Sequence, residues 1–293
     1  MPERMHVSAP ASAANLGPGF DCLGIALELR NEVTIGPSRG GGIEVEVEGE
    51  GVRAASRGPD NLFVRAFQSA GADLTGLRFE MQNRIPFHRG LGSSAATISA
   101  GVAAGLAWSG READPLPGAV ALEGHPDNVA AAILGGITLA WSGAEGPAAI
   151  RLRSDCPADL VIAVPDEELP TKLAREALPA SIAHADAAHT AARAALLVAA
   201  LESGRTELLA DALDDRLHEP YRAPFVPLLG AVRARLGGLP VYGATISGAG
   251  PSVLVWCERG AGTTVAAALA DVAPRVLPLP VADAGVVVSE TAG

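Results

Sequence analysis

The spacing of apolar residues predicts both strands and helices in the first half of the chain. Apolar side chains alternate with glutamates over residues 43–48 and with charged or amide side chains over residues 77–82. A period of two is typical of a strand with one buried face. Ile98, Val102 and Leu106 instead fall four apart in an alanine-rich run, which predicts a helix.

The same reading places the other elements. An N-terminal strand is expected within residues 6–36, and a helix is expected to begin near Leu62, with Asp60 or Asn61 as its N-cap. Further strands are predicted at 137–141, 160–164, 253–257 and 286–288, and further helices at 130–133, 169–175, 185–202 and 263–270. The mixture of both kinds of element indicates an α+β fold.

The chain of 293 residues is long enough for one large domain or two ordinary ones. Gly143–Pro147 is the best candidate boundary, because turn-forming residues cluster there between two regions of regular pattern. We therefore expect two domains, at residues 1–150 and 151–293.

A glycine-rich loop joins the predicted strand at 77–82 to the helix that contains Ile98. The segment Pro86–Thr97 reads Pro-Phe-His-Arg-Gly-Leu-Gly-Ser-Ser-Ala-Ala-Thr. Such a loop directs several backbone N–H groups to one point, and the dipole of the following helix adds partial positive charge there. We therefore expect a site for a polyanion, and for phosphate in particular. The alternative is a tight turn in which Ser93 or Ser94 is an ordinary N-cap.

Two common phosphate-binding motifs do not match this loop. A Walker loop places a lysine after its last glycine, but Gly92 is followed by two serines and the only lysine of the chain is Lys172. A dinucleotide fingerprint is also excluded, since no Gly-x-Gly-x-x-Gly opens the helix. Phosphate would then be held by backbone amides, the helix dipole and two hydroxyls, and Mg²⁺ would neutralise more of its charge.

Composition restricts the class of protein further. A formal net charge of −11 argues against a nucleic-acid surface, which needs a basic patch. Cys22, Cys156 and Cys257 are too few and too far apart for a disulfide framework or a zinc site. We see no secretory leader and no uninterrupted apolar run of about 18 residues, so we expect a cytoplasmic protein without a membrane span.

Two polar clusters are candidates for chemistry. Asn15 and Asp21 flank an irregular Gly-Pro-Gly turn, and apolar neighbours would press both side chains against the core, where they need partners. A surface turn in which they bond to local backbone is the alternative. In the second cluster, Glu123 is suited to Mg²⁺ together with phosphate oxygens, whereas zinc would need a second His or Cys near His125. Asp127 is then placed to meet a substrate hydroxyl.

The C-terminal half offers fewer candidates. Leu213–Arg222 carries a run of charged residues that is typical of a solvated helix face. Arg222 is kept as a candidate, because Pro220 and Pro224 hold it in a stiff segment. Gly243–Ser252 is a second glycine-rich turn.

Together, the Pro86–Thr97 loop, Glu123–Asn128 and Ile246–Ser252 resemble the GHMP kinase superfamily, which includes galactokinases, homoserine kinases and mevalonate kinases. Within it, the closest similarity is to the homoserine kinase branch, and it is carried by Ser12–Asp21, Glu123–Asn128 and His218–Arg222. The resemblance implies a two-lobed α+β fold, with an ATP-binding N-terminal lobe like domain 2 of ribosomal protein S5. A ferredoxin-like C-terminal lobe would follow, with the active site between the two.

The resemblance also implies a reaction and a set of roles. ATP, with Mg²⁺, would phosphorylate the side-chain hydroxyl of L-homoserine to O-phospho-L-homoserine in threonine biosynthesis. Ser93 and Glu123 would ligate the metal and, with Asp127, form the catalytic set. The nucleotide would contact Asn61, Pro86, Phe87, His88, Arg89, Gly90, Leu91, Gly92, Ser93, Ser94, Ala95 and Ala96. The acceptor would contact Asn15, Asp21, His125, Asp127, Arg175 and Arg222.

Several alternatives stay open at this point. Asp127 either acts as a general base or orients the hydroxyl, and a loose transition state favours orientation. Arg89 either contacts phosphate or faces solvent. Arg175 and Arg222 favour a carboxylated acceptor over a sugar, and acceptor side chains for an ammonium favour homoserine over mevalonate. A ligand sensor that has kept only the fold is a third possibility, although the presence of Ser93, Glu123 and Asp127 argues against it. The sequence is compatible with a homodimer.

Overall fold

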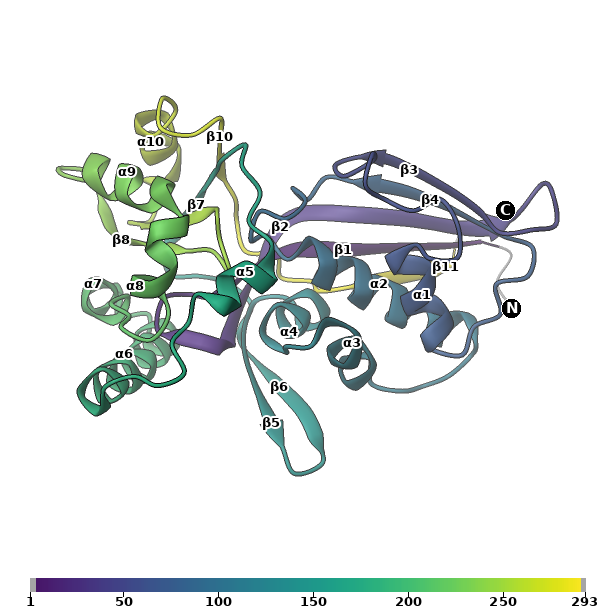
Figure 1. Cartoon of the computed structure of the whole chain (residues 1–293), viewed down its shortest axis with the longest axis horizontal. Helices are drawn as coiled ribbons and strands as arrows, with labels where there is room; N and C mark the ends of the chain where they lie inside the picture. The colour runs from purple at the N-terminus through teal and green to yellow at the C-terminus, as the bar shows by residue number, and fades with distance from the viewer. Residues whose placement is uncertain (1–3, 291–293) are drawn as a thin grey trace.

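The computed structural model describes residues 4–290 and shows two lobes joined by a long strand pair (Figure 1). The first lobe is built on a seven-stranded sheet around β1 (Met5–Asn15) and β2 (Gly19–Pro37). The hydrogen-bonded order is β11-β1-β2-β4-β3, and β5 and β6 branch from β2. The remaining strands of this sheet are β3 (Glu44–Gly49), β4 (Leu77–Asn83), β5 (Ile137–Gly143), β6 (Gly146–Arg153) and β11 (Val287–Glu290).

Four helices complete the first lobe: α1 (Leu62–Ser69), α2 (Ser93–Trp108), α3 (Pro115–Glu123) and α4 (Asp127–Leu134). Helix α4 packs against β1 and β2, and α2 packs against β1, while α1 and α3 pack against α2. The four-residue spacing of Ile98, Val102 and Leu106 marks one buried stripe of α2, as predicted. Burying this stripe fixes the position of the α2 N-terminus, where the glycine-rich loop ends.

The second lobe has the strand order of a ferredoxin-like fold. Its antiparallel sheet runs β10-β7-β9-β8, and the chain order β-α-β-β-α-β matches that motif. The predicted two-lobed α+β fold is therefore confirmed. The strands are β7 (Asp159–Val164), β8 (Val241–Ile246), β9 (Val253–Cys257) and β10 (Arg275–Pro278). The helices are α5 (Thr171–Glu176), α6 (His184–Ser203), α7 (Leu209–Ala212), α8 (Glu219–Arg222), α9 (Pro227–Arg235) and α10 (Gly262–Ala268), with 3₁₀ turns at Thr206–Leu208 and Ala223–Phe225.

The lobes do not divide where the sequence places the boundary. The candidate linker at Gly143–Pro147 is the turn of a hairpin, because β5 and β6 pair antiparallel on either side of it. Strand β6 therefore continues the first lobe to Arg153. At the C-terminus, β11 returns to the first lobe and pairs with β1. The sequence does not distinguish these arrangements, because a hairpin turn and a linker use the same residue types.

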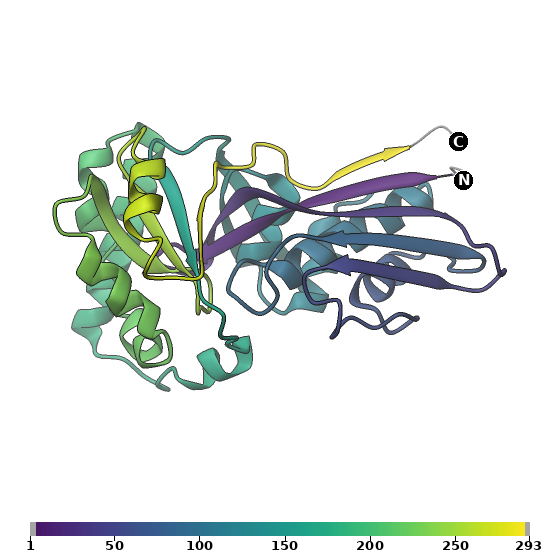
Figure 2. The ribbon, with the colours of Figure 1, turned by 90° about the horizontal axis from the view of Figure 1, so that it is seen from above.

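The β1–β2 hairpin connects the lobes, and its tip is inserted into the second lobe (Figure 2). At the tip, the Gly17 carbonyl oxygen lies 2.7 Å from Nε2 of His218. The backbone N–H of Gly248 donates to the Ala14 carbonyl at 3.1 Å. The hairpin therefore holds the turn after β8 against the glycine-rich loop, and residues from both lobes meet there.

Within residues 4–290, no helix combines the length and the apolar character that crossing a membrane requires.

Candidate active site

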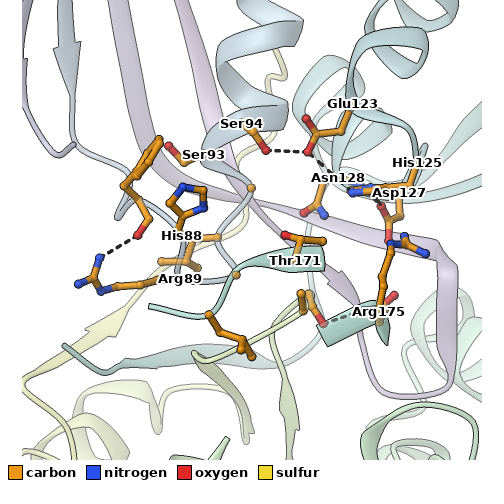
Figure 3. A pocket seen from close by; sticks show the side chains of 18 of the residues that line it. His88, Arg89, Ser93, Ser94, Glu123, His125, Asp127, Asn128, Thr171 and Arg175 are labelled. Carbon is orange, nitrogen blue, oxygen red and sulfur yellow. Dashed lines mark hydrogen bonds and ion pairs between the residues drawn. The ribbon is translucent and has the colours of Figure 1, made fainter. Parts of the chain in front are cut away.

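A cavity of about 180 Å³ lies where the two lobes meet, and it gathers polar residues that are distant in sequence (Figure 3). Its walls come from the β1–β2 tip, the loop before α2, the α3–α4 connection, α5, and the turn after β8. The residues that matter below are Asn15, Asp21, Phe87, Arg89, Gly92, Ser93, Ser94, Glu123, His125, Asp127, Thr171, Arg175 and Arg222.

The glycine-rich loop ends at Gly92, which adopts a left-handed conformation with φ of 65° at the N-cap of α2. A Cβ at this position would collide with Oγ of Ser12, which is itself held by a 2.9 Å hydrogen bond to Oδ1 of Asn128. Because Gly92 offers no side-chain cap, the first N–H groups of α2 remain available to a ligand. The capped-turn alternative is therefore wrong, and an anion site at the start of this 16-residue helix is favoured.

Gly90 holds the same loop against the second lobe. Oγ of Ser247 donates to the Gly90 carbonyl at 2.6 Å. The Cα of Gly90 also faces the Ser247 and Gly250 carbonyl oxygens so closely that no Cβ can be accommodated. The second glycine-rich turn thus supports the first.

Glu123 is the last residue of α3, and its side chain is 9% exposed. Its Oε1 accepts a 2.6 Å hydrogen bond from Oγ of Ser94. The hydroxyl that contacts Glu123 belongs to Ser94 and not to Ser93, because successive residues of a helix point about 100° apart. Burial raises the pKa of Glu123, although the Ser94 hydrogen bond and the His125 charge act in the opposite direction.

Asp127 begins α4 and is 2% exposed. One carboxylate oxygen, Oδ1, lies 3.0 Å from Nδ1 of His125 and accepts a 2.7 Å hydrogen bond from the Asn128 N–H. The other oxygen is thus left for a ligand in the cavity. Burial lowers the pKa of His125, but its hydrogen bond and ion pair with Asp127 outweigh burial and raise that pKa overall.

The tip of the β1–β2 hairpin is conformationally strained. Asn15, Leu16 and Asp21 all have positive φ, at 68°, 52° and 56°, a conformation that side chains with a Cβ rarely adopt. Asn15 Nδ2 donates to the Gly248 carbonyl at 2.8 Å, and Asn15 Oδ1 accepts from the Asp21 N–H at 3.0 Å. Asn15 is therefore not on the surface, since it is 3% exposed, although its bond to the Asp21 N–H is local.

This geometry presents the Asp21 carboxylate to Arg175 of α5. The two guanidinium nitrogens lie 2.8 and 3.0 Å from the two carboxylate oxygens, a bidentate ion pair between the lobes. The hydrogen bond and the charge of Asp21 raise the pKa of Arg175 despite partial burial. Two of the predicted acceptor-binding residues are thus partners of each other.

The charged run at 213–222 is not a solvated helix face. Asp215, His218, Glu219 and Arg222 are each at most 5% exposed. Buried charge requires partners, and these residues have them: Asp215 accepts from three backbone N–H groups, and Glu219 pairs with Arg233 at 2.8 Å. The sequence could not show this, because a charge run has the same pattern whether water or protein satisfies it.

Arg222 lines the cavity and lies next to His218, which is in its neutral form. Burial lowers the pKa of His218, so its Nε2–H donates to the Gly17 carbonyl while Nδ1 faces Arg222 at 3.4 Å. Nε of Arg222 donates to the Ala174 carbonyl at 3.1 Å, and the guanidinium lies over the Phe20 ring. Arg222 is therefore fixed, with one edge toward the cavity.

Arg89 does not face bulk solvent, because its side chain is only 13% exposed, and it lines the cavity. Its guanidinium turns to the second lobe and donates to backbone carbonyls of Pro165 and Asp166. His88 is exposed and has φ of 53°. Pro86, Leu91, Ala95 and Ala96 are buried beneath the loop and help to fix its path.

A second cavity of about 220 Å³ adjoins the first and shares Leu62, Phe87, Ser93 and Ser94 with it. Asn61 borders this cavity and caps α1, because its Oδ1 accepts from the Phe63 N–H at 2.9 Å. Most of the other walls are apolar, and they include Val33, Ala54, Ala55, Phe63 and Met81.

Two family models match the chain: "GHMP kinases N terminal domain" over residues 61–136 and "GHMP kinases C terminal" over residues 197–275. The chain belongs to the GHMP kinase family. The first match covers the glycine-rich loop, Glu123 and Asp127, and the second covers Arg222 and the turn after β8. Asn15 and Asp21 of the hairpin tip, and Thr171 and Arg175 of α5, line the same cavity of this GHMP kinase but lie outside the matched ranges.

Individual relatives extend the similarity over nearly the whole chain. A homoserine kinase of Streptomyces avermitilis is 44% identical over 277 residues, which cover 89% of this chain and 88% of that protein. A homoserine kinase of Deinococcus radiodurans is 40% identical and covers 96% of each chain. The crystal structure of homoserine kinase from Cytophaga hutchinsonii superposes with a TM-score of 0.87 at 27% identity, covering 99% of this chain and 98% of that one.

Sequence reasoning missed Asn31, which lies at the floor of the second cavity of this GHMP kinase. It is 5% exposed, and its Oδ1 accepts from the N–H groups of Arg84 and Ile85 at 2.8 and 3.0 Å, just where the glycine-rich loop begins. One signal was available in the sequence. Asn31 is an amide on the same face of β2 as the buried Val33, where the period of two predicts an apolar side chain.

Proposed function

We propose that this GHMP kinase transfers the γ-phosphoryl group of ATP to the side-chain hydroxyl of L-homoserine and so forms O-phospho-L-homoserine for threonine biosynthesis. The observation that carries this proposal is the Asp21–Arg175 ion pair, which lies in the same cavity as Asp127 and the N-terminus of α2. A zwitterionic amino acid needs one acceptor for its ammonium and one donor for its carboxylate. The ion pair supplies both at one place.

The two cavities suit different parts of the nucleotide. The exposed N–H groups of α2 and the Gly90–Gly92 backbone suit the phosphates. The apolar second cavity suits a base, because ligand pockets combine apolar walls with a few polar groups. Asn61 and Asn31 are among the polar side chains that line that cavity.

The donor set near the phosphates fits Mg²⁺. This cation is usually bound through one or two carboxylates together with substrate phosphates. Glu123 provides one such carboxylate, and Ser94 orients it through Oε1 while Oε2 remains for a cation. Among the described residues no three His, Cys, Asp or Glu side chains converge as a metal cage. Glu123 would hold Mg²⁺ together with Ser93, and the metal when bound would neutralise charge on the phosphoryl group.

The chain's own residues position the acceptor. Asp21 and Asn15 would receive the ammonium, Arg175 and Arg222 the carboxylate, and the free oxygen of Asp127 the hydroxyl. Phosphoryl transfer depends mainly on such positioning and on charge stabilisation. Because His125 already occupies Oδ1 of Asp127, we propose that Asp127 orients the hydroxyl.

Replacing Asp127 by asparagine tests this role. Asn keeps an oxygen for the Asn128 N–H, so we expect turnover to fall by less than about a hundredfold, below the usual range for loss of a general base. A near-total loss with unchanged folding would show that Asp127 is the base. The pKa of His125, measured by NMR titration, should fall in this variant, because Asp127 is the group that raises it.

The acceptor itself is tested by ADP release with purified protein, ATP and Mg²⁺. We expect release with L-homoserine and none above the ATP-only rate with mevalonate or galactose. Release with one of the other two alcohols alone would contradict the proposed acceptor. ATP binding without release in any mixture would favour a sensor over an enzyme.

A further inference from the structure

Arg89 makes more contacts between the lobes than any sequence reading of the loop suggests. Its Nε donates to the Pro165 carbonyl at 2.9 Å and its NH2 group to the Asp166 carbonyl at 2.6 Å. Its NH1 group donates to the carbonyl of Phe87 at 2.8 Å, within the loop itself. The side chain is only 13% exposed. A guanidinium so fully engaged by backbone is fixed in place.

The segment that Arg89 holds leads directly to the acceptor site. Residues 165–170, here called the connecting segment, join β7 to α5. Arg89 binds the start of this segment, and the Leu169 N–H near its end donates to the His88 carbonyl at 3.2 Å. Helix α5 follows at once and places Arg175 on Asp21. The glycine-rich loop thus forms hydrogen bonds with both ends of the connecting segment, just before the helix that carries Arg175.

A second contact continues this path to the other arginine. The Ala174 carbonyl of α5 accepts from Nε of Arg222 at 3.1 Å. Any displacement of the connecting segment would therefore move Arg175 and release a partner of Arg222. Both arginines that we assign to the acceptor carboxylate depend on the position of this segment.

The negative charge of the connecting segment explains why a cationic side chain such as Arg89 is needed beside it. Asp166, Glu167 and Glu168 are exposed carboxylates next to a loop that we expect to hold polyphosphate. Like charges repel, so this segment would move away from a bound nucleotide unless it were held. Arg89 supplies the opposing charge, but its main contacts are to carbonyls, and its distance to Oε1 of Glu168 is 3.6 Å.

We propose that Arg89 is a positioning residue that couples the nucleotide site to the acceptor site, by fixing the connecting segment and hence Arg175 against the glycine-rich loop. Ordering of the loop by nucleotide phosphates then orders α5, and the acceptor binds more tightly. The coupling is reciprocal: a bound acceptor tightens nucleotide binding by the same factor. The acceptor part of this inference rests on the proposed function.

Hydrogen exchange tests the coupling without any acceptor. In the wild-type protein, a non-hydrolysable ATP analogue with Mg²⁺ should slow exchange in peptides that cover residues 165–176. In Arg89→Ala this protection should be lost, while peptides over the α2 N-terminus are still protected. Equal protection of residues 165–176 in both proteins would overturn the proposal. Arg84→Ala is the matched control, because Arg84 directly precedes the same loop and its side chain contacts only Glu32 and Arg30 of the first lobe.

Acceptor binding gives the second readout. We expect the analogue to tighten L-homoserine binding to the wild-type protein by a factor within the usual range of about 5–150. In Arg89→Ala, the analogue should change homoserine affinity by no more than about twofold, and Arg89→Lys should restore part of the effect. Glu168→Gln and Arg84→Ala should show the same tightening as the wild-type protein. An unchanged factor in a folded Arg89→Ala protein contradicts the proposal. Failure of the wild-type protein to bind homoserine would contradict the proposed acceptor instead, and the exchange result would still decide the role of Arg89.

Discussion

Replacing Glu123 by glutamine should nearly abolish phosphoryl transfer and yet stabilise the ligand-free protein. Glutamine keeps an oxygen for the Ser94 hydroxyl, so the local packing is retained. It removes the one carboxylate that we assign to Mg²⁺, and losing several kcal/mol of charge stabilisation lowers turnover by about a thousandfold or more. It also removes a largely buried charge, which costs free energy in the folded state. Function and stability therefore change in opposite directions.

The stabilisation should depend on pH in a defined direction. Burial raises the folded-state pKa of Glu123 above its ordinary value of 4.5. A group with a raised pKa contributes stability that is present below its unfolded-state pKa and is lost as pH rises through the folded-state pKa. The difference in melting temperature between Glu123→Gln and the wild-type protein should therefore be small at acidic pH and grow toward neutral pH. A difference that is constant with pH would contradict this origin.

Mg²⁺–ATP should reverse the order of stability. A ligand that binds only the folded state stabilises it, and the wild-type protein should gain more than the variant because only the wild type keeps the metal ligand. Glu112→Gln is the matched control, since Glu112 is exposed just before α3. It should leave turnover, melting temperature and the Mg²⁺ response unchanged. Full activity of Glu123→Gln at ordinary Mg²⁺ concentrations would rule out the metal role.

Replacing Gly90 by alanine should reduce turnover by about a hundredfold, the size expected when reacting groups are displaced by about an ångström. Gly90 has φ of 68°, and a Cβ there would collide with the backbone oxygens of Ser247 and Gly250. Backbone cannot rotate out of the way as a side chain can. The loop must therefore separate from the turn after β8, and the Ser247 hydrogen bond to Gly90 is lost with it.

Gly110→Ala separates the effect of the left-handed backbone from the effect of the Cβ collision. Gly110 has φ of 64°, nearly the same as Gly90, but a Cβ added at Gly110 would meet no heavy atom within 4 Å beyond its chain neighbours. Both variants should lose roughly 1–2 kcal/mol of stability from the left-handed conformation alone. Only Gly90→Ala should lose turnover and raise the KM for ATP. If both variants keep wild-type kinetics, the contact between the loop and the turn is not needed for catalysis.

Local pattern was enough to predict most of the elements that position the site. The period-two segment at 77–82 and the four-residue spacing of α2 both depend on side chains facing one buried surface, so the sequence carries them directly. The glycine-rich loop was predictable for a different reason, because its glycines and serines are contiguous in sequence. The pairing of Ser94 with Glu123 was not, since it depends on the rotation of α2 against α3.

Contacts between the lobes could not be predicted from the local sequence pattern. Nothing near Arg89 indicates that its donors meet the Pro165 and Asp166 carbonyls, because those partners are backbone atoms with no sequence signature. The burial of Asp215, His218, Glu219 and Arg222 depends likewise on the tip of the β1–β2 hairpin, from a distant part of the chain. The same is true of β11, which completes the first sheet from the C-terminus.

We propose that the inter-lobe cavity binds ATP beside an amino-acid alcohol and joins the two by phosphoryl transfer. Phosphorus NMR of purified protein with ATP, Mg²⁺ and L-homoserine tests it most directly, because the spectrum identifies the new bond. We predict a phosphomonoester signal that splits through coupling to the γ-methylene protons of the product and grows in step with ADP. Growth of inorganic phosphate in place of that ester, or an unchanged ATP spectrum, would contradict the claim.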